Sequence, residues 1–172
     1  MTQIYQDENK IYQFDFSSAI WSSNMLQQIF HTNNAGILSD VDFIAETHEE
    51  ILLIEYKNAN IPGAAHPEAF QPMDQKREHK IARKYYDSWI YLTAIRKNKP
   101  VAYIYILEYP NSDAVMRKRI RNHIADLLPF QLQKLPEIQT ELIRSFEVLS
   151  IAEWNAHSKY RFFPITPVNA GR

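Results

Sequence analysis

The sequence predicts an α/β fold, in which a mixed central β-sheet carries helices on both of its faces. Two observations lead to this prediction. The segments 37–46 and 51–57 each place apolar residues on both parities of a strand, as strands do when both of their faces are covered. Segments with apolar residues at helical spacing stand on either side of this pair, and helices layered on a sheet are a usual way to cover it.

The first part of the chain is expected to hold one strand and one helix. Residues 11–16 alternate between apolar and polar side chains, which is typical of a strand. Ser17 or Ser18 can cap a helix that continues to about His31, because apolar residues recur in this segment at helical spacing. The asparagines and the glycine within residues 33–36 then predict a turn.

The middle of the chain predicts a β-hairpin, a loop and a long helix. The two apolar segments, 37–46 and 51–57, are joined by polar residues and form the hairpin. Residues 58–72 contain three prolines and a glycine, which favours a loop. Residues 73–97 carry an apolar stripe at helical spacing, and the first half of this helix is basic.

The remaining elements complete one domain, expected to span residues 1–172 with a core over about 11–109 and further elements over 111–172. In chain order we expect a strand over 101–109, a helix over 112–128, an ambiguous stretch to residue 143, a strand over 146–149, a short helix behind a Ser150–Glu153 capping box, and an irregular tail.

The composition excludes several classes of function. The chain of 172 residues has no cysteine, which excludes disulfides and thiolate metal sites, and its three glycines form no phosphate-binding loop. The six histidines show no close ligand spacing, so the probable metal ligands are oxygens. No signal segment or membrane span is visible, so we expect a cytoplasmic protein with no membrane partner. The net charge of -1 means that any contact with nucleic acid is local.

One group of side chains carries the chemistry. Glu55 and Lys57 are two residues apart on a predicted strand, so they point to the same side. If the hairpin connection is centred on His48 and Glu49, Asp42 lies directly opposite Glu55. Opposed carboxylates in an apolar sheet repel unless a cation neutralises them, and an oxygen-only ligand set favours Mg²⁺ or Mn²⁺. Lys57 would then stabilise charge at a reacting phosphate.

This pattern resembles the second and third motifs of the PD-(D/E)XK nuclease superfamily, over residues 39–59, SDVDFIAETHEEILLIEYKNA. The resemblance implies a restriction-endonuclease-like core of the order α-β-β-β-α-β. It also implies a metal-dependent endonuclease that hydrolyses phosphodiester bonds, in DNA rather than RNA. Asp42, Glu55 and Lys57 fall on the catalytic positions, and the Tyr56 carbonyl becomes a further ligand of Mg²⁺ or Mn²⁺.

The chain departs from the family pattern at the first helix. Many members carry a glutamate there, whereas the segment 17–32 has no acid, and Asn24, Gln27 and Gln28 are its nearest polar substitutes. An alternative function is therefore a nuclease-like module without turnover that binds nucleic acid or assembles with protein. A structural alternative also stays open, in which the three charged residues form an ion pair on an exposed sheet edge.

Four basic residues at helical spacing in the first half of the long helix could bind the phosphates of nucleic acid: Lys76, Lys80, Arg83 and Lys84. The same residues could instead form a solvated helix face that pairs with Glu78 and Asp87. Nucleic acid is the expected partner, and the sequence leaves open whether the chain forms a homodimer.

Overall fold

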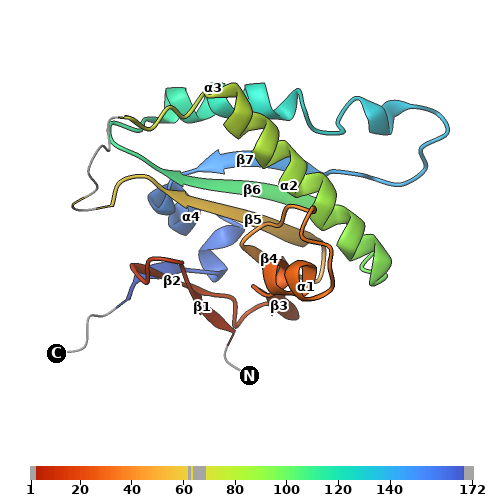
Figure 1. The fold of residues 1–172 in the computed structure, drawn as a ribbon, viewed down its shortest axis with the longest axis horizontal. Coiled ribbons are helices and arrows are strands. Elements are labelled where there is room, and N and C mark those ends of the chain that lie inside the picture. The colour runs from red at the N-terminus through yellow and green to blue at the C-terminus, as the bar shows by residue number, and fades with distance from the viewer. Residues whose placement is uncertain (1–2, 62, 64–68, 169–172) are drawn as a thin grey trace.

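The computed structural model describes residues 3–61, 63 and 69–168 and contains a five-stranded mixed sheet (Figure 1). Its strands, in their order across the sheet, are β3 (Trp21–Ser23), β4 (Phe43–Glu46), β5 (Ile51–Asn58), β6 (Val101–Glu108) and β7 (Ser145–Leu149). The pairs β3–β4 and β4–β5 are antiparallel, and β5–β6 and β6–β7 are parallel. The predicted α/β class with a mixed central sheet is therefore confirmed.

Helices make the parallel connections and cover one face of this sheet. Helix α2 (Gln75–Ala94) links β5 to β6, and α3 (Ala114–Ala125), followed by the 3₁₀ turn η2 (Leu132–Lys134), links β6 to β7. Asp74 caps α2 by accepting a hydrogen bond from the Arg77 amide at 2.9 Å. Both helices lie within the segments 73–97 and 112–128 that the sequence predicted.

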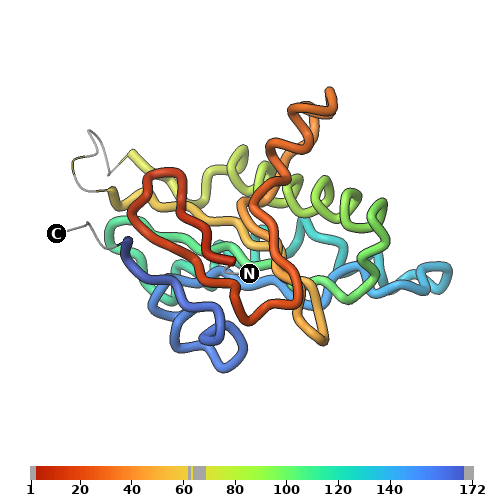
Figure 2. The backbone as a smooth tube through the Cα atoms, turned by 90° about the horizontal axis from the view of Figure 1, so that it is seen from below, coloured from red at the N-terminus to blue at the C-terminus, as the bar shows by residue number. Residues whose placement is uncertain are grey.

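The opposite face is covered by a small second sheet and the C-terminal elements. The small sheet contains β1 (Ile4–Gln6), β2 (Tyr12–Asp15) and β8 (Ile165–Pro167), and β2 lies in its middle. Figure 2 shows the β1–β2 hairpin lying across the strands, on the side away from α2. The helix α4 (Ile151–Ala156), with its predicted capping box, and the 3₁₀ turn η3 (Tyr160–Phe162) lie beside it. The tail expected to be irregular thus contains η3 and β8.

Each face of the central sheet has its own apolar core, which explains why the strands are apolar on both parities. Leu53 and Ile44 pack into the core beneath the helices, together with Tyr85 of α2. Leu52 and Ile54 pack into the core on the other face, against the small sheet and Trp154 of α4. The alternation of β5 therefore assigns every one of its side chains to a known face.

The helix predicted over residues 17–31 is wrong in its first half. Trp21, Ser22 and Ser23 form β3, which pairs with β4, and only α1 (Leu26–Thr32) is helical. The Ile20 amide donates to the Glu46 carbonyl at 2.8 Å, so pairing with β4 satisfies the backbone of this segment. The predicted apolar stripe faces a core only in part: Leu26 is buried, and Trp21 and Ile29 pack against the core beneath the helices. Ile20 and Met25 are 49% and 44% exposed.

The first strand of the hairpin is also shorter than the predicted 37–46. The residues before Phe43 lie along α2 and do not pair with a neighbouring strand: the Ser39 amide donates to Asp87 at 2.7 Å and the Val41 amide donates to the Ser88 hydroxyl at 3.2 Å.

Among the described residues, no helix combines the length and apolar character that crossing a bilayer requires.

Candidate functional site

The register of the hairpin places Asp42 opposite Glu55, as the sequence predicted. Phe43 pairs with Ile54, and each following pair keeps the same register to the end of β4. Asp42 is the next residue along, directly before the strand. Its Oδ2 accepts a hydrogen bond from the Tyr56 amide at 2.7 Å, which holds the carboxylate against β5. The local backbone therefore fixes the position of one of the two acids.

The three predicted catalytic residues lie on the helix-covered side of the sheet. Glu55 and Lys57 follow Leu53 at the two-residue period of β5, and Leu53 belongs to the core beneath the helices. Their burial differs: Glu55 is only 6% exposed, Asp42 is half-buried, and Lys57 is exposed. The two acids and the amine thus share one face, with Lys57 at its solvent edge.

Helix α2 supplies the ammonium that contacts Glu55. Lys84 Nζ lies 2.7 Å from Oε1 and 2.7 Å from Oε2 of Glu55, so the ion pair uses both carboxylate oxygens. The side chains of Lys84 and Glu55 are 14% and 8% exposed. Lys84 was predicted as one of four residues for nucleic acid, and the structure instead places it inside the acidic site.

The pKa values of Glu55, Asp42 and Lys84 are all raised. Burial raises the pKa of Glu55 well above its ordinary value, and the charge of Asp42 adds to the effect against the opposing Lys84. Burial likewise raises the pKa of Asp42, although Lys84 and the Tyr56 amide oppose it. Burial alone would lower the pKa of Lys84, but the surrounding carboxylates outweigh it and raise that pKa.

A third carboxylate contributes to this field. Asp40 is half-buried, and burial raises its pKa despite the charges of Lys84 and His31. The charge of Asp40 in turn raises the pKa values of Asp42 and Glu55. The charges of three acids therefore act on the Lys84 ammonium, and the site carries a deficit of positive charge that a proton or a further cation can fill.

A cavity of about 280 Å³ opens beside Asp42 and Lys57. Its wall includes Asn24 and Gln27, two of the three polar residues that stand where a family glutamate would be expected. Glu8, from the turn between β1 and β2, also lines it, and its charge raises the pKa of Asp42. Sequence reasoning missed Glu8, because the pairing of the small sheet that brings this turn to the cavity has no local signal.

Two carboxylates are available to a metal ion in this site. Across residues 3–61, 63 and 69–168, no three His, Asp or Glu side chains come together in an arrangement that could hold a metal. Mg²⁺ keeps several of its waters and is commonly bound through one or two carboxylates. Asp42 and Glu55 fit that requirement for one ion, provided that the Glu55 oxygens exchange the Lys84 ammonium for it.

The remaining residues of the predicted basic group differ in their surroundings. Lys76 and Lys80 are exposed on α2, and the charge of Lys80 lowers the pKa of Asp40. Arg83 is held by local contacts, since it donates to the carboxylate of Asp87 at 3.2 Å and to the Ile37 carbonyl at 2.7 Å. Lys76 and Lys80 are thus the members that are exposed and have no contact of this kind, and Lys80 is the one whose charge acts on an acid of the site.

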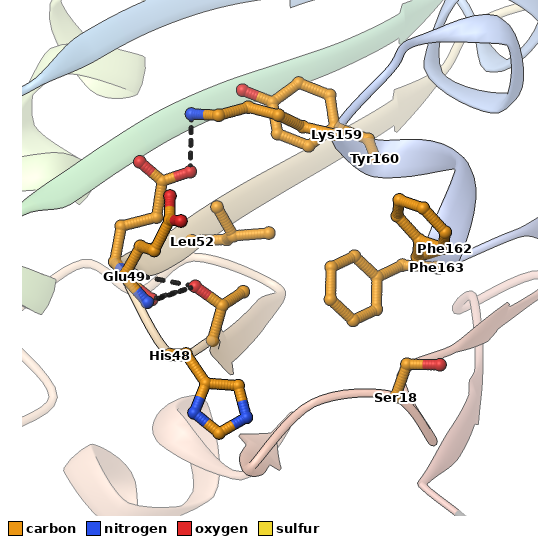
Figure 3. A pocket seen from close by; sticks show the side chains of 10 residues that line it. Ser18, His48, Glu49, Leu52, Lys159, Tyr160, Phe162 and Phe163 are labelled. Atoms are coloured by element: carbon orange, nitrogen blue, oxygen red, sulfur yellow. Dashed lines mark hydrogen bonds and ion pairs between the residues drawn. The ribbon is translucent and has the colours of Figure 1, made fainter.

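A second cavity, of about 440 Å³, lies by the turn between β4 and β5. Leu52, Phe162 and Phe163 give it apolar walls, with His48 and Ser18 on its other side (Figure 3). Leu52 belongs to the core on the face of the sheet opposite to Glu55. At its rim Lys159 is paired with Glu50 at 2.8 Å. This cavity is separate from the acidic site.

Comparisons of the chain with protein-family models, with curated protein sequences and with solved structures gave no significant match.

Proposed function

We propose that this protein is a metal-dependent nuclease that hydrolyses phosphodiester bonds in nucleic acid, with DNA as the favoured substrate. In this proposal Asp42, Glu55 and the Tyr56 carbonyl hold Mg²⁺ or Mn²⁺. Lys57 places its ammonium beside the phosphate, where it stabilises the charge that develops on the oxygens. Lys76 and Lys80 contact phosphates further along the strand.

The observation that carries the proposal is the deficit of positive charge between two opposed carboxylates. Asp42 is fixed across the hairpin from Glu55 by the Tyr56 amide, and both acids have raised pKa values although Lys84 is beside them. A buried pair of carboxylates costs free energy, and acids with raised pKa values are typical of functional sites. When bound, a divalent ion would neutralise these acids and act as a Lewis acid on a phosphate oxygen.

The topology gives further support. The strands β3, β4 and β5 form an antiparallel meander, and α2 then leads to β6, which is parallel to β5. The PD-(D/E)XK core has this order after its first helix, and its acids lie on the second and third strands. This chain differs because α1 stands between β3 and β4 and no helix precedes β3 among the described residues.

A cleavage assay with matched variants tests the proposal. Supercoiled plasmid and a labelled single-stranded oligonucleotide are incubated with the protein in Mg²⁺ or Mn²⁺, and with EDTA as a control. Wild-type cleavage should require the metal, and Asp42→Ala, Glu55→Ala and Lys57→Ala should each lower the rate by at least about 100-fold. The exposed Glu137 and Lys118 supply matched controls, whose alanine variants should cleave at the wild-type rate.

Cleavage by Lys57→Ala at the wild-type rate would refute the role given to that residue. Metal-independent cleavage that survives in Asp42→Ala would refute the site as a whole. Each variant should keep the circular-dichroism spectrum of the wild type, so that loss of activity reports on chemistry and not on unfolding.

One observation favours a second candidate, a nuclease-like module without turnover that binds nucleic acid or protein. Lys84 already contacts both oxygens of Glu55, and a fixed ion pair could hold the fold without any metal. Calorimetric titration with Mn²⁺ separates the two candidates. Binding that is lost in Asp42→Ala supports the nuclease, whereas absence of binding at millimolar Mn²⁺ supports the inactive module.

A further inference from the structure

We propose that the Lys84 ammonium and a divalent cation are alternative occupants of the same place beside Glu55, so that the ion binds only when Lys84 leaves. This inference rests on the proposed metal site and specifies which cation occupies that site in the absence of metal. It makes Lys84 a positioning residue, which acts on Glu55 and not on the substrate.

The contact geometry makes the two cations exclusive. Lys84 Nζ is equidistant from Oε1 and Oε2 of Glu55, at 2.7 Å from each, which is the place where a cation shared by both oxygens would lie. A Mg²⁺ ion bound to either oxygen would lie at about 2.1 Å from it. The ion and the ammonium would then be only a few ångström apart, and like charges at that separation repel strongly in a site that excludes bulk water.

Lys84 has the means to leave. Among the described residues its ammonium is paired with one carboxylate, and its stem of four carbons comes from a half-buried flank of α2, where Lys80 lies one turn earlier. Lys80 and Arg83 next to it are exposed, so rotation of the stem takes the charge of Lys84 toward solvent. The helix itself need not move for the exchange.

Lys84→Met tests the inference because methionine keeps most of the stem and removes the competing charge. Lys118→Met is the matched control: it removes the same charge from an exposed position on α3, outside both the proposed metal site and the proposed phosphate contacts. Mn²⁺ binding is measured for the full chain by calorimetry and by the loss of free Mn²⁺ signal in electron paramagnetic resonance. Lys84→Met should bind Mn²⁺ at least about tenfold more tightly than wild type, and Lys118→Met should bind it within about threefold of wild type.

Three outcomes separate this inference from the proposed function. Wild-type binding that Lys84→Met does not strengthen beyond Lys118→Met overturns the exchange and leaves the metal site standing. Binding by Lys84→Met alone supports competition between Lys84 and the ion, and because the wild type then binds no Mn²⁺, it favours the module without turnover over the nuclease. No binding by either protein overturns both.

A second measurement covers the case in which Lys84→Met does not fold. Lysine ammonium groups held in buried ion pairs exchange their protons slowly and are visible by ¹⁵N nuclear magnetic resonance. The wild-type signal of Lys84 should be lost when Mg²⁺ is added, while that of Lys97, which is paired with Glu46, should stay. A Lys84 signal that persists at saturating Mg²⁺ contradicts the exchange.

Discussion

In the absence of metal, the substitution Lys84→Met should lower the free energy of unfolding by about 2 kcal/mol at pH 7. The variant leaves Glu55, 6% exposed, without the ammonium that contacts both of its oxygens. Glu55 then escapes the cost of a buried charge by taking up a proton. For an acid with the ordinary pKa of 4.5, that protonation costs at most about 3.4 kcal/mol at pH 7, since each pH unit is worth about 1.4 kcal/mol. The wild type already bears part of this cost, because burial and Asp42 raise the pKa of Glu55.

The sign of the pH dependence follows from the same argument. Protonating Glu55 costs less as the pH falls, and the ceiling drops to about 2 kcal/mol at pH 6. The difference between wild type and Lys84→Met should therefore shrink on acidification. Urea unfolding followed by circular dichroism at both pH values measures it. The double variant Lys84→Met/Glu55→Gln should recover most of the loss, because it removes the buried charge.

The exposed Lys76 provides the control, since Lys76→Met should change the free energy of unfolding by less than about 0.5 kcal/mol. If Lys84→Met behaves like Lys76→Met, or if its effect does not depend on pH, then the pair with Glu55 does not carry the energy assigned to it. Lys84 would then not be the group that stabilises the buried charge of Glu55.

Three further predictions concern other parts of the fold. A hydrogen bond from Lys97, aided by Lys99, lowers the pKa of Glu46 against the effect of its burial. The ionised Glu46 therefore contributes to the free energy of unfolding above about pH 4.5, and this contribution is lost on acidification. In urea unfolding, the stability advantage of wild type over Glu46→Gln should disappear between about pH 6 and pH 3. Ser150→Ala removes the capping box of α4 and should cost about 1 kcal/mol in the same assay, whereas Ala in place of the exposed Ser158 should cost nothing measurable. Ile104→Val in the middle of β6, where the side chain is fully buried, should lower the free energy of unfolding by about 1 kcal/mol, and an unchanged midpoint would contradict its place in the core.

The sequence was sufficient to predict the centre of the fold. The register between β4 and β5 follows from a short polar connection between two apolar segments, and this local rule placed Asp42 opposite Glu55. The long helix and the strand after it were predicted within a few residues, because apolar side chains recur along them at a clear period. Local patterns determine these elements, so no information about distant contacts was needed.

The errors come from contacts between distant segments. The segment 21–23 has a helical pattern of apolar residues, but hydrogen bonds from β4 make it a strand. The contact of Lys84 with Glu55 joins residues 29 positions apart on different elements, and its charge pattern alone also suited a basic surface. A signal was present at helical spacing: Lys84 lies one turn from the buried Ile81 and Ser88, which marks a half-buried flank of α2.

The pairing of β2 with β8 joins Phe14 to Ile165, near opposite ends of the described chain. During synthesis on the ribosome, the cover over the apolar face of the central sheet that carries Ile54 and Ile104 is incomplete until β8 has emerged. A nascent or truncated chain that stops before β8 should thus expose part of this apolar surface and require chaperones. Pairing of the early hairpin with β8 makes the emergence of β8 the event that completes the small sheet.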